Sequence, residues 1–220
     1  MLGADGCPGG GWVVAEVRPD WPVRWHHVVG MGPLLALADE LGAGAVAVDV
    51  PIGLPAGGVR ASDVAARQRL RGGGSSSVFA TPHRAALAFA TYAEARPHLP
   101  TLSAQAFALV ARIRDVDEVL RAAGPQVHDR VVECHPEVSL RALTGQVLAR
   151  KKSAPGALAR LAALRAEFGE LPTDVHPAAG LDDALDALAC AWTARRWLRG
   201  EAEVLGEQRD ALGTPMRIVV

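Results

Sequence analysis

The chain contains 220 residues, of which 50% are hydrophobic and 21% are charged, and its formal net charge is −1. A chain of this length can bury a full hydrophobic core, either as one large α/β domain or as a domain with an insertion. The near-neutral charge excludes an overall basic surface for nucleic acid but leaves local basic patches open.

The sequence carries no export signal and no membrane segment. No apolar run approaches the ~20 residues that cross a bilayer, and the N-terminus lacks a basic stretch followed by a long apolar one. The three cysteines, Cys7, Cys134 and Cys190, are an odd number and lie far apart in the chain, which favours free thiols in a reducing compartment. We therefore expect a cytoplasmic protein that does not contact membranes.

Two short apolar runs each end on a single aspartate. Residues 2–4 lead into Asp5, which is followed by a turn rich in Gly and Pro, and residues 46–48 lead into Asp49, which is followed by two prolines. Pro and Gly at these positions end a strand. A carboxylate at the tip of a buried strand is costly unless it is hydrogen-bonded, paired or bound to a cation. Asp5 and Asp49 are therefore the first candidate functional residues.

The N-terminal third predicts three antiparallel strands followed by a helix and a parallel strand. Residues 12–17 and 23–29 are β-branched or aromatic runs on either side of a turn, and they follow the strand over 2–5. Apolar residues at helical spacing predict a helix over 33–41 that ends at Gly42. A strand over 45–50 that is reached through this helix should run parallel to its neighbour.

The middle of the chain predicts a helical insertion or lid over residues 56–128. Within it, Ser62 is expected to cap a helix that continues to Leu70, with Asp63 and Arg67 paired one turn apart. A run of Gly and Ser over 72–77 predicts a hinge, because it lacks the residue order of a phosphate-binding loop. A longer amphipathic helix is expected over 102–122.

The C-terminal half predicts further strands and helices. A strand over 127–134 carries Glu133 near its end, and Pro136 is typical of a helix start. Two more helices are expected over 155–168 and 181–199, followed by a last strand over 216–220.

The last of these helices carries an acidic face. On a helical wheel, Asp182, Asp183 and Asp186 lie opposite an apolar stripe of Leu181, Leu185, Leu188 and Trp192. Acidic residues in a first turn can simply cap the helix and complement its dipole. Asp186 lies a turn further along, where capping no longer accounts for it.

Several segments together carry a resemblance to a known family. Three antiparallel strands, a helix, a parallel strand ending in Asp and a late acidic helix resemble the ribonuclease H-like superfamily, and LDDALDALACA is similar to the final-helix motif of Holliday-junction resolvases. The Arg60–Asp63–Arg67 spacing and the segments GADGCPGGGWVVA, VDVPIGLP, SSVFATP, LSAQAF, VVECHPEVS and LDDALDALA resemble an uncharacterised family of predicted ribonuclease H-like nucleases. The resemblance implies one ribonuclease H-like domain over residues 1–220, with a mixed five-stranded sheet and helices on both faces.

The same resemblance implies a metal-dependent nuclease that hydrolyses phosphodiester bonds. Asp5, Asp49, Asp183 and Asp186 match the metal ligands of the superfamily, and Glu133 joins them as a candidate catalytic residue. Carboxylates suit Mg²⁺ or Mn²⁺, and two such ions can neutralise the attacking and leaving oxygens.

Positive charge near this acidic site is needed to hold RNA or DNA, which are polyanions. The only two lysines, Lys151 and Lys152, stand side by side among 21 arginines, and with Arg67 and His135 they are the candidate substrate-binding residues. Two alternatives stay open: a non-catalytic binding or regulatory module with the same fold, and a phosphotransferase acting on a small phosphate ester. The sequence specifies neither RNA or DNA nor an oligomeric state.

Overall fold

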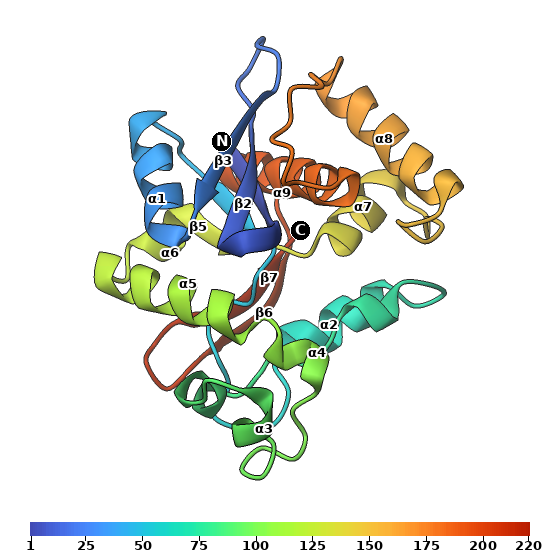
Figure 1. Ribbon diagram of the computed structural model, residues 1–220. Helices are drawn as coiled ribbons and strands as arrows, with labels where there is room; N and C mark the ends of the chain where they lie inside the picture. Colours follow the sequence, from blue (N-terminus) through green and yellow to red (C-terminus); the bar gives the residue numbers. More distant parts are fainter.

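The computed structural model describes residues 1–220. Its centre is a five-stranded sheet in the order β3-β2-β1-β4-β5 (Figure 1). The first three strands are antiparallel, whereas β4 and β5 run parallel to β1. This is the ribonuclease H-like topology, and it confirms the predicted fold class. The strands are β1 (Leu2–Gly6), β2 (Gly11–Glu16), β3 (Arg24–Val29), β4 (Val46–Val48) and β5 (Val131–Glu133).

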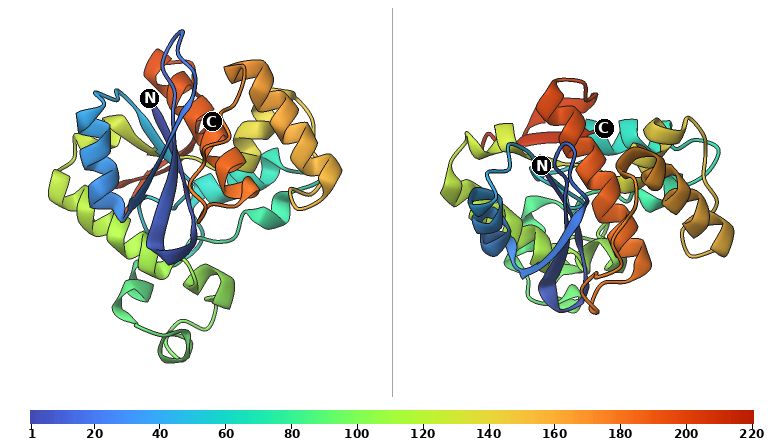
Figure 2. Two further views of the ribbon diagram at one scale, coloured as in Figure 1. Left: turned by 45° about the horizontal axis from the view of Figure 1, so that its top comes forward. Right: turned by 90° about the horizontal axis from the view of Figure 1, so that it is seen from above.

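Helices cover both faces of the sheet (Figure 2). One face packs against α1 (Met31–Glu40) and α5 (Val110–Ala123), whose apolar residues share a core with those of β1 and β4. The other face packs against α9 (Leu181–Arg199), which is itself covered by α7 (Pro136–Thr144) and α8 (Ala154–Phe168). No helix of the protein combines the length and the apolar character needed to cross a membrane.

The contact between α9 and β1 depends on a glycine. A Cβ atom at Gly3 would lie 2.0 Å from the backbone nitrogen of Ala191 and 2.3 Å from the carbonyl oxygen of Ala187. Only glycine in the strand and alanines in the helix allow the two backbones to approach so closely. This contact fixes the position of α9 along β1, and with it the position of the helix's acidic residues.

The segment between β4 and β5 has two parts. Residues 56–109, which we call the lid, contain α2 (Ala61–Arg69), α3 (Tyr92–Ala95) and α4 (Ala104–Phe107), with 3₁₀ turns at Ser75–Ser77 and Arg84–Ala88. Outside the lid, a third 3₁₀ turn at Pro8–Gly10 joins β1 to β2. The second part consists mainly of α5, whose Ile113, Val116 and Leu120 belong to the core beneath the sheet.

A second sheet ties the lid to the end of the chain. It consists of β6 (Val204–Arg209) and β7 (Pro215–Val219), and α2 packs on both strands. Val219 in turn forms a parallel bridge with Cys134 just after β5. The lid is therefore held by the main sheet and by the C-terminal hairpin together.

Several predicted elements differ from those in the structure. The helix predicted over 102–122 is two helices, because α4 packs into the small core of the lid and α5 into the main core. Residues 127–130 form a short helix, α6 (Val127–Arg130), rather than the start of a strand. The carbonyls of this turn accept hydrogen bonds from Arg217 and Trp197, contacts with the distant C-terminal region that local sequence does not reveal.

Two further predictions, for side chains of α2 and of α9, differ from the structure. Ser62 lies inside α2, fully buried and without a capping bond, and Asp63 pairs with Arg60 instead of Arg67. In α9, Leu181 is 61% exposed, whereas every residue from Ala184 to Ala194 is buried. Leu185, Leu188 and Trp192 of the predicted apolar stripe are buried as expected, and burial extends to the other sides of α9 because the helix lies between the sheet and the outer helices.

Candidate active site

Asp5 and Asp49 lie side by side at one edge of the sheet. Strands β1 and β4 are parallel neighbours in which Ala4 faces Val48, so both aspartates stand at the carboxyl ends of their strands. Successive side chains of a strand point to opposite faces. Because Gly3 meets α9 and Ala47 belongs to the core against α9, the alternation directs Asp5 and Asp49 toward that helix as well.

Helix α9 brings two more aspartates to the same place. Asp186 is 3% exposed, and its Oδ2 atom accepts a hydrogen bond from Nζ of Lys151 at 2.6 Å, while Oδ1 has no partner. Asp183 accepts a hydrogen bond from the backbone N–H of Gly180 at 2.9 Å. Asp183 therefore caps the helix, whereas Asp186 does not.

The three inner carboxylates repel one another. Burial raises the pKa of Asp5 well above its ordinary value, and the charges of Asp49 and Asp186 raise it further. Burial and Asp186 raise the pKa of Asp49 to about 8. Burial also raises the pKa of Asp186 to about 6, although the adjacent Lys151 lowers it. No side chain donates a hydrogen bond to Asp5 or Asp49, so Lys151 is the main compensating charge of the cluster.

These residues line one cavity with a volume of about 270 Å³. The lid forms its opposite wall through residues 77–79 and Thr81. The structure thus brings together most of the site residues expected from the sequence: Asp5, Asp49, Glu133, His135, Lys151, Asp183 and Asp186.

The chemistry of this cavity suits a hard divalent cation. Its donors are carboxylate oxygens, which Mg²⁺ and Mn²⁺ prefer, and Asp186 keeps one buried oxygen without a partner. No group of three or more His, Cys, Asp or Glu side chains stands in metal-binding geometry, however. Nζ of Lys151 instead supplies the positive charge at Asp186, so the residues match the ion in donor type but are not arranged to coordinate it in this structure.

Glu133 lies in the same wall but is engaged elsewhere. Arg60, which is 2% exposed, donates to both of its carboxylate oxygens at 2.7 and 2.6 Å, and the backbone N–H of Ile52 donates to Oε2 at 2.7 Å. Arg60 also donates to Asp63, at 2.6 Å. Burial acts to lower the pKa of Arg60, but Glu133 and Asp63 outweigh it and raise the pKa above its ordinary value. This buried group joins α2 of the lid to β5.

The other basic residues expected near the site are spread out. Lys152 is exposed and lines a neighbouring hollow beyond Lys151. Arg67 donates from Nε to the carbonyl of Val78 at 2.7 Å and lines a second cavity in the lid. His135 lies in the carboxylate cavity, and burial lowers its pKa, so it is neutral at neutral pH.

Arg112 is a residue of this site that the sequence did not reveal. It comes from α5, and its Nη2 atom donates to the carbonyls of Cys7 and Gly11 at 2.9 and 3.3 Å, while Nη1 makes no hydrogen bond. A Cβ atom at Gly6 would lie 1.6 Å from Nη1, so glycine there makes room for the guanidinium. The only sequence signal was this glycine directly after Asp5, since Arg112 itself sits in an otherwise ordinary amphipathic helix.

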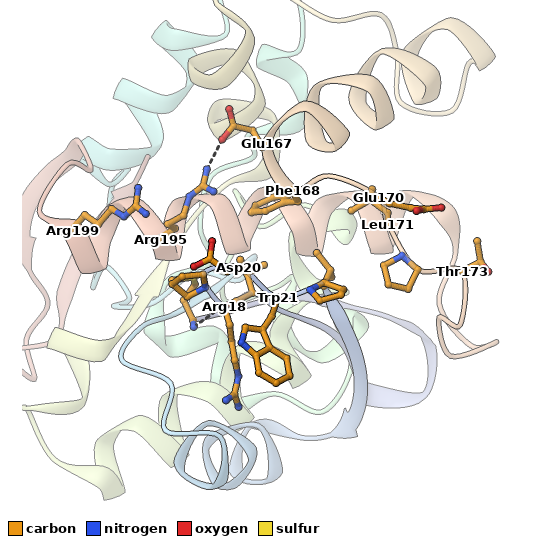
Figure 3. A pocket seen from close by; sticks show the side chains of 16 residues that line it. Arg18, Asp20, Trp21, Glu167, Phe168, Glu170, Leu171, Thr173, Arg195 and Arg199 are labelled. Atoms are coloured by element: carbon orange, nitrogen blue, oxygen red, sulfur yellow. Dashed lines mark hydrogen bonds and ion pairs between the residues drawn. The ribbon is translucent and has the colours of Figure 1, made fainter.

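A larger hollow lies elsewhere (Figure 3). It has a volume of about 670 Å³ and includes Met1 and Val17, at the end of the sheet opposite to Asp5. Two of its arginines are already paired, Arg195 with Glu167 and Arg18 with Glu16. It contains no cluster of buried carboxylates, so the smaller cavity is the better candidate for chemistry.

The sheet topology and the grouped aspartates define a ribonuclease H-like α/β protein with an acidic cavity at the carboxyl ends of its central strands. The model of a family described as proteins of unknown function, DUF429, matches residues 3–211. The chain therefore belongs to this family, which agrees with the family-level resemblance of the sequence. No curated protein and no solved structure matches the chain.

Proposed function

We propose that the protein is a metal-dependent phosphodiesterase that acts on nucleic acid. The observation that carries the proposal is the cluster of Asp5, Asp49 and Asp186, three carboxylates from two strand ends and one helix that lie close enough to raise one another's pKa. Such a cluster destabilises the fold unless its charge is neutralised by protons, by Lys151 or by a bound cation, and clusters of this kind are characteristic of functional sites.

Each group of the cavity has a part in this reaction. Asp5, Asp49 and Asp186 would hold Mg²⁺ or Mn²⁺, and Asp183 stands where it can orient a water molecule. When bound, divalent ions neutralise charge on the attacking and leaving oxygens of a phosphodiester. The free Nη1 of Arg112 can donate to a phosphate oxygen. Lys151, once an ion takes its place beside Asp186, is free to do the same.

Hydrolysis by single-residue variants tests the proposal. The substrates are bis(p-nitrophenyl) phosphate and labelled DNA and RNA oligonucleotides, with Mn²⁺ present. Asp5→Asn and Asp186→Asn should each lower kcat about a hundredfold or more, because each removes charge stabilisation at the reacting centre. Asp39→Asn is the matched control, since Asp39 is 70% exposed and pairs only with Arg130. Equal rates for Asp5→Asn and Asp39→Asn would overturn the proposal.

The ion pair between Lys151 and Asp186 favours a second candidate, a non-catalytic binding module. A lysine that already neutralises part of the cluster lets the cavity persist without a cation. In that case Mn²⁺ has no effect on the protein, and Lys151→Met destabilises it by leaving Asp186 buried without a partner.

A further inference from the structure

A second cavity opens next to the carboxylates and shares a wall with them. This lid cavity has a volume of about 440 Å³, within the range of small-molecule sites. Phe79 and Thr81 line both cavities. The wall is held in place, because the backbone N–H of Thr81 donates to the buried Asp63 at 2.9 Å and that of Arg84 donates to Pro55 at 2.9 Å.

The lid cavity combines an aromatic face with an unpaired cation. Phe79 packs with one side against the small core of the lid and is half-buried, and Leu99 and Leu102 extend the apolar surface. Arg67 uses only Nε, toward Val78, and its two terminal nitrogens make no hydrogen bond. An aromatic wall beside a free guanidinium suits a planar ring attached to a phosphate.

The shape of the cavity bears on the kind of nucleic acid. Its walls come from three stretches of the lid, residues 58–67, 79–83 and 99–106, so a ligand in it is contacted by three segments of the chain. A base that is paired and stacked in a duplex must leave the helix before it can enter such a pocket. An unpaired base enters directly and stacks on an aromatic side chain.

We infer that the substrate is single-stranded nucleic acid, with the base of one nucleotide stacked on Phe79 in the lid cavity and its phosphate near Arg67. This inference rests on the proposed function for the identity of the reacting group. Because Phe79 and Thr81 line both cavities, a nucleotide bound in the lid cavity would lie next to the phosphodiester that faces Asp5 and Asp49.

Fluorescence anisotropy with a labelled oligothymidylate and with a duplex of equal length tests the inference. Ca²⁺ replaces Mn²⁺ so that binding is measured without turnover. We expect the single strand to bind at least about tenfold more tightly than the duplex, and Phe79→Leu to weaken single-strand binding about fivefold or more, because base stacking on an aromatic ring is lost. Binding of the duplex should not change.

Phe107→Leu is the matched control. Phe107 is also partly buried against the core of the lid but lines neither cavity, so its variant should bind oligothymidylate like the wild type. Equal affinity for single strand and duplex, or equal losses in the two Phe→Leu variants, would overturn the inference.

Hydrolysis of bis(p-nitrophenyl) phosphate separates this inference from the proposed function. That diester has no base, so its hydrolysis reports on the carboxylate cavity without the base site, and Asp5→Asn should abolish it. Hydrolysis without a preference for single strands supports the proposed function and contradicts the inference. Single-strand binding that depends on Phe79, without any hydrolysis, supports the base site and contradicts the proposed function.

Discussion

At the scale of single residues, the carboxylates at the ends of β1 and β4 determine how the protein responds to pH. The folded state raises the pKa of Asp49 to about 8, far above its ordinary value, so between about pH 4 and pH 8 the folded state holds a proton that the unfolded state releases. The free energy of unfolding should therefore be highest at the acidic end of this window and should fall as pH rises toward 8.

Replacing Asp49 by Asn should flatten this dependence. Without a carboxylate to ionise, the variant should gain on the wild type as pH rises, by about 1 kcal/mol or more at pH 8 relative to pH 5. Urea unfolding of both proteins in EDTA, at several pH values, measures the difference. Parallel pH profiles would mean that Asp49 titrates normally.

Site residues could be predicted from the sequence where local segments position them, and not where distant parts of the chain do. Asp5 and Asp49 were predictable because strand, turn and carboxylate are contiguous in the sequence. Asp186 was suggested by its place beyond the capping turn. Arg112 was not predictable, since its role depends on a helix crossing the turn at Gly6. The ion pair of Glu133 with Arg60 was not predictable either, because the two residues are 73 positions apart in the chain.

At the scale of elements, the contact of β1 with α9 requires glycine in the strand. Gly3→Ala would place a methyl group 2.0 Å from the backbone of α9, and we expect a loss of about 1–3 kcal/mol in unfolding free energy, as for other overpacked cores. Gly32→Ala is the control, because a Cβ atom there meets nothing within 4 Å. In the first turn of α1, where Gly32 is half-buried, the substitution should stabilise the protein by about 0.5–1 kcal/mol. Denaturant unfolding of the two variants measures both changes in unfolding free energy, which should have opposite signs.

The junction of lid and sheet depends on the buried Arg60. Arg60→Met should cost about 3–5 kcal/mol, because it leaves the buried carboxylates of Glu133 and Asp63 without a counter-charge. Arg69→Met breaks only the ion pair with Glu203, whose side chains are 52% and 44% exposed, and should cost less than about 1 kcal/mol. Similar losses for both variants, measured by urea unfolding, would contradict the view that Arg60 joins the lid to β5.

The elements themselves were predictable where local pattern and tertiary contacts agree. Strands β1 to β4, α1, α8 and α9 were expected close to their observed bounds, because their turns and apolar spacing are local features. Strand β6 was not predicted, since VLGEQR is mostly polar and is defined by its partner β7. The short helix α6 was predicted as the beginning of a strand, because its conformation is fixed by side chains from α9 and β7.

At the scale of the whole molecule, binding of a divalent cation should stabilise the fold. Mn²⁺ at a hundred times its Kd adds about 2.7 kcal/mol, which corresponds to a rise of about 5–10 °C in Tm for a chain of this size. Asp5→Asn should remove this response and should raise the Tm of the metal-free protein by about 2–4 °C, because one of the mutually repelling charges is gone. Differential scanning fluorimetry with and without EDTA measures both effects. An unchanged wild-type Tm with millimolar Mn²⁺ would mean that the free protein has no such metal site.

The packing of α2 on the C-terminal hairpin also affects how the protein is made. The inner face of α2, with Ala66 and Leu70, shares its core with Leu205 and Ile218, residues that are synthesised more than 130 residues after α2. Until then the apolar side of α2 has only Val78 and Val138 of this core as partners, and contacts between such distant parts of a chain form slowly. The nascent chain therefore passes through a stage in which α2 has been synthesised but most of its core is missing. A chaperone that covers α2 during this interval would protect the protein from aggregation at its most exposed moment.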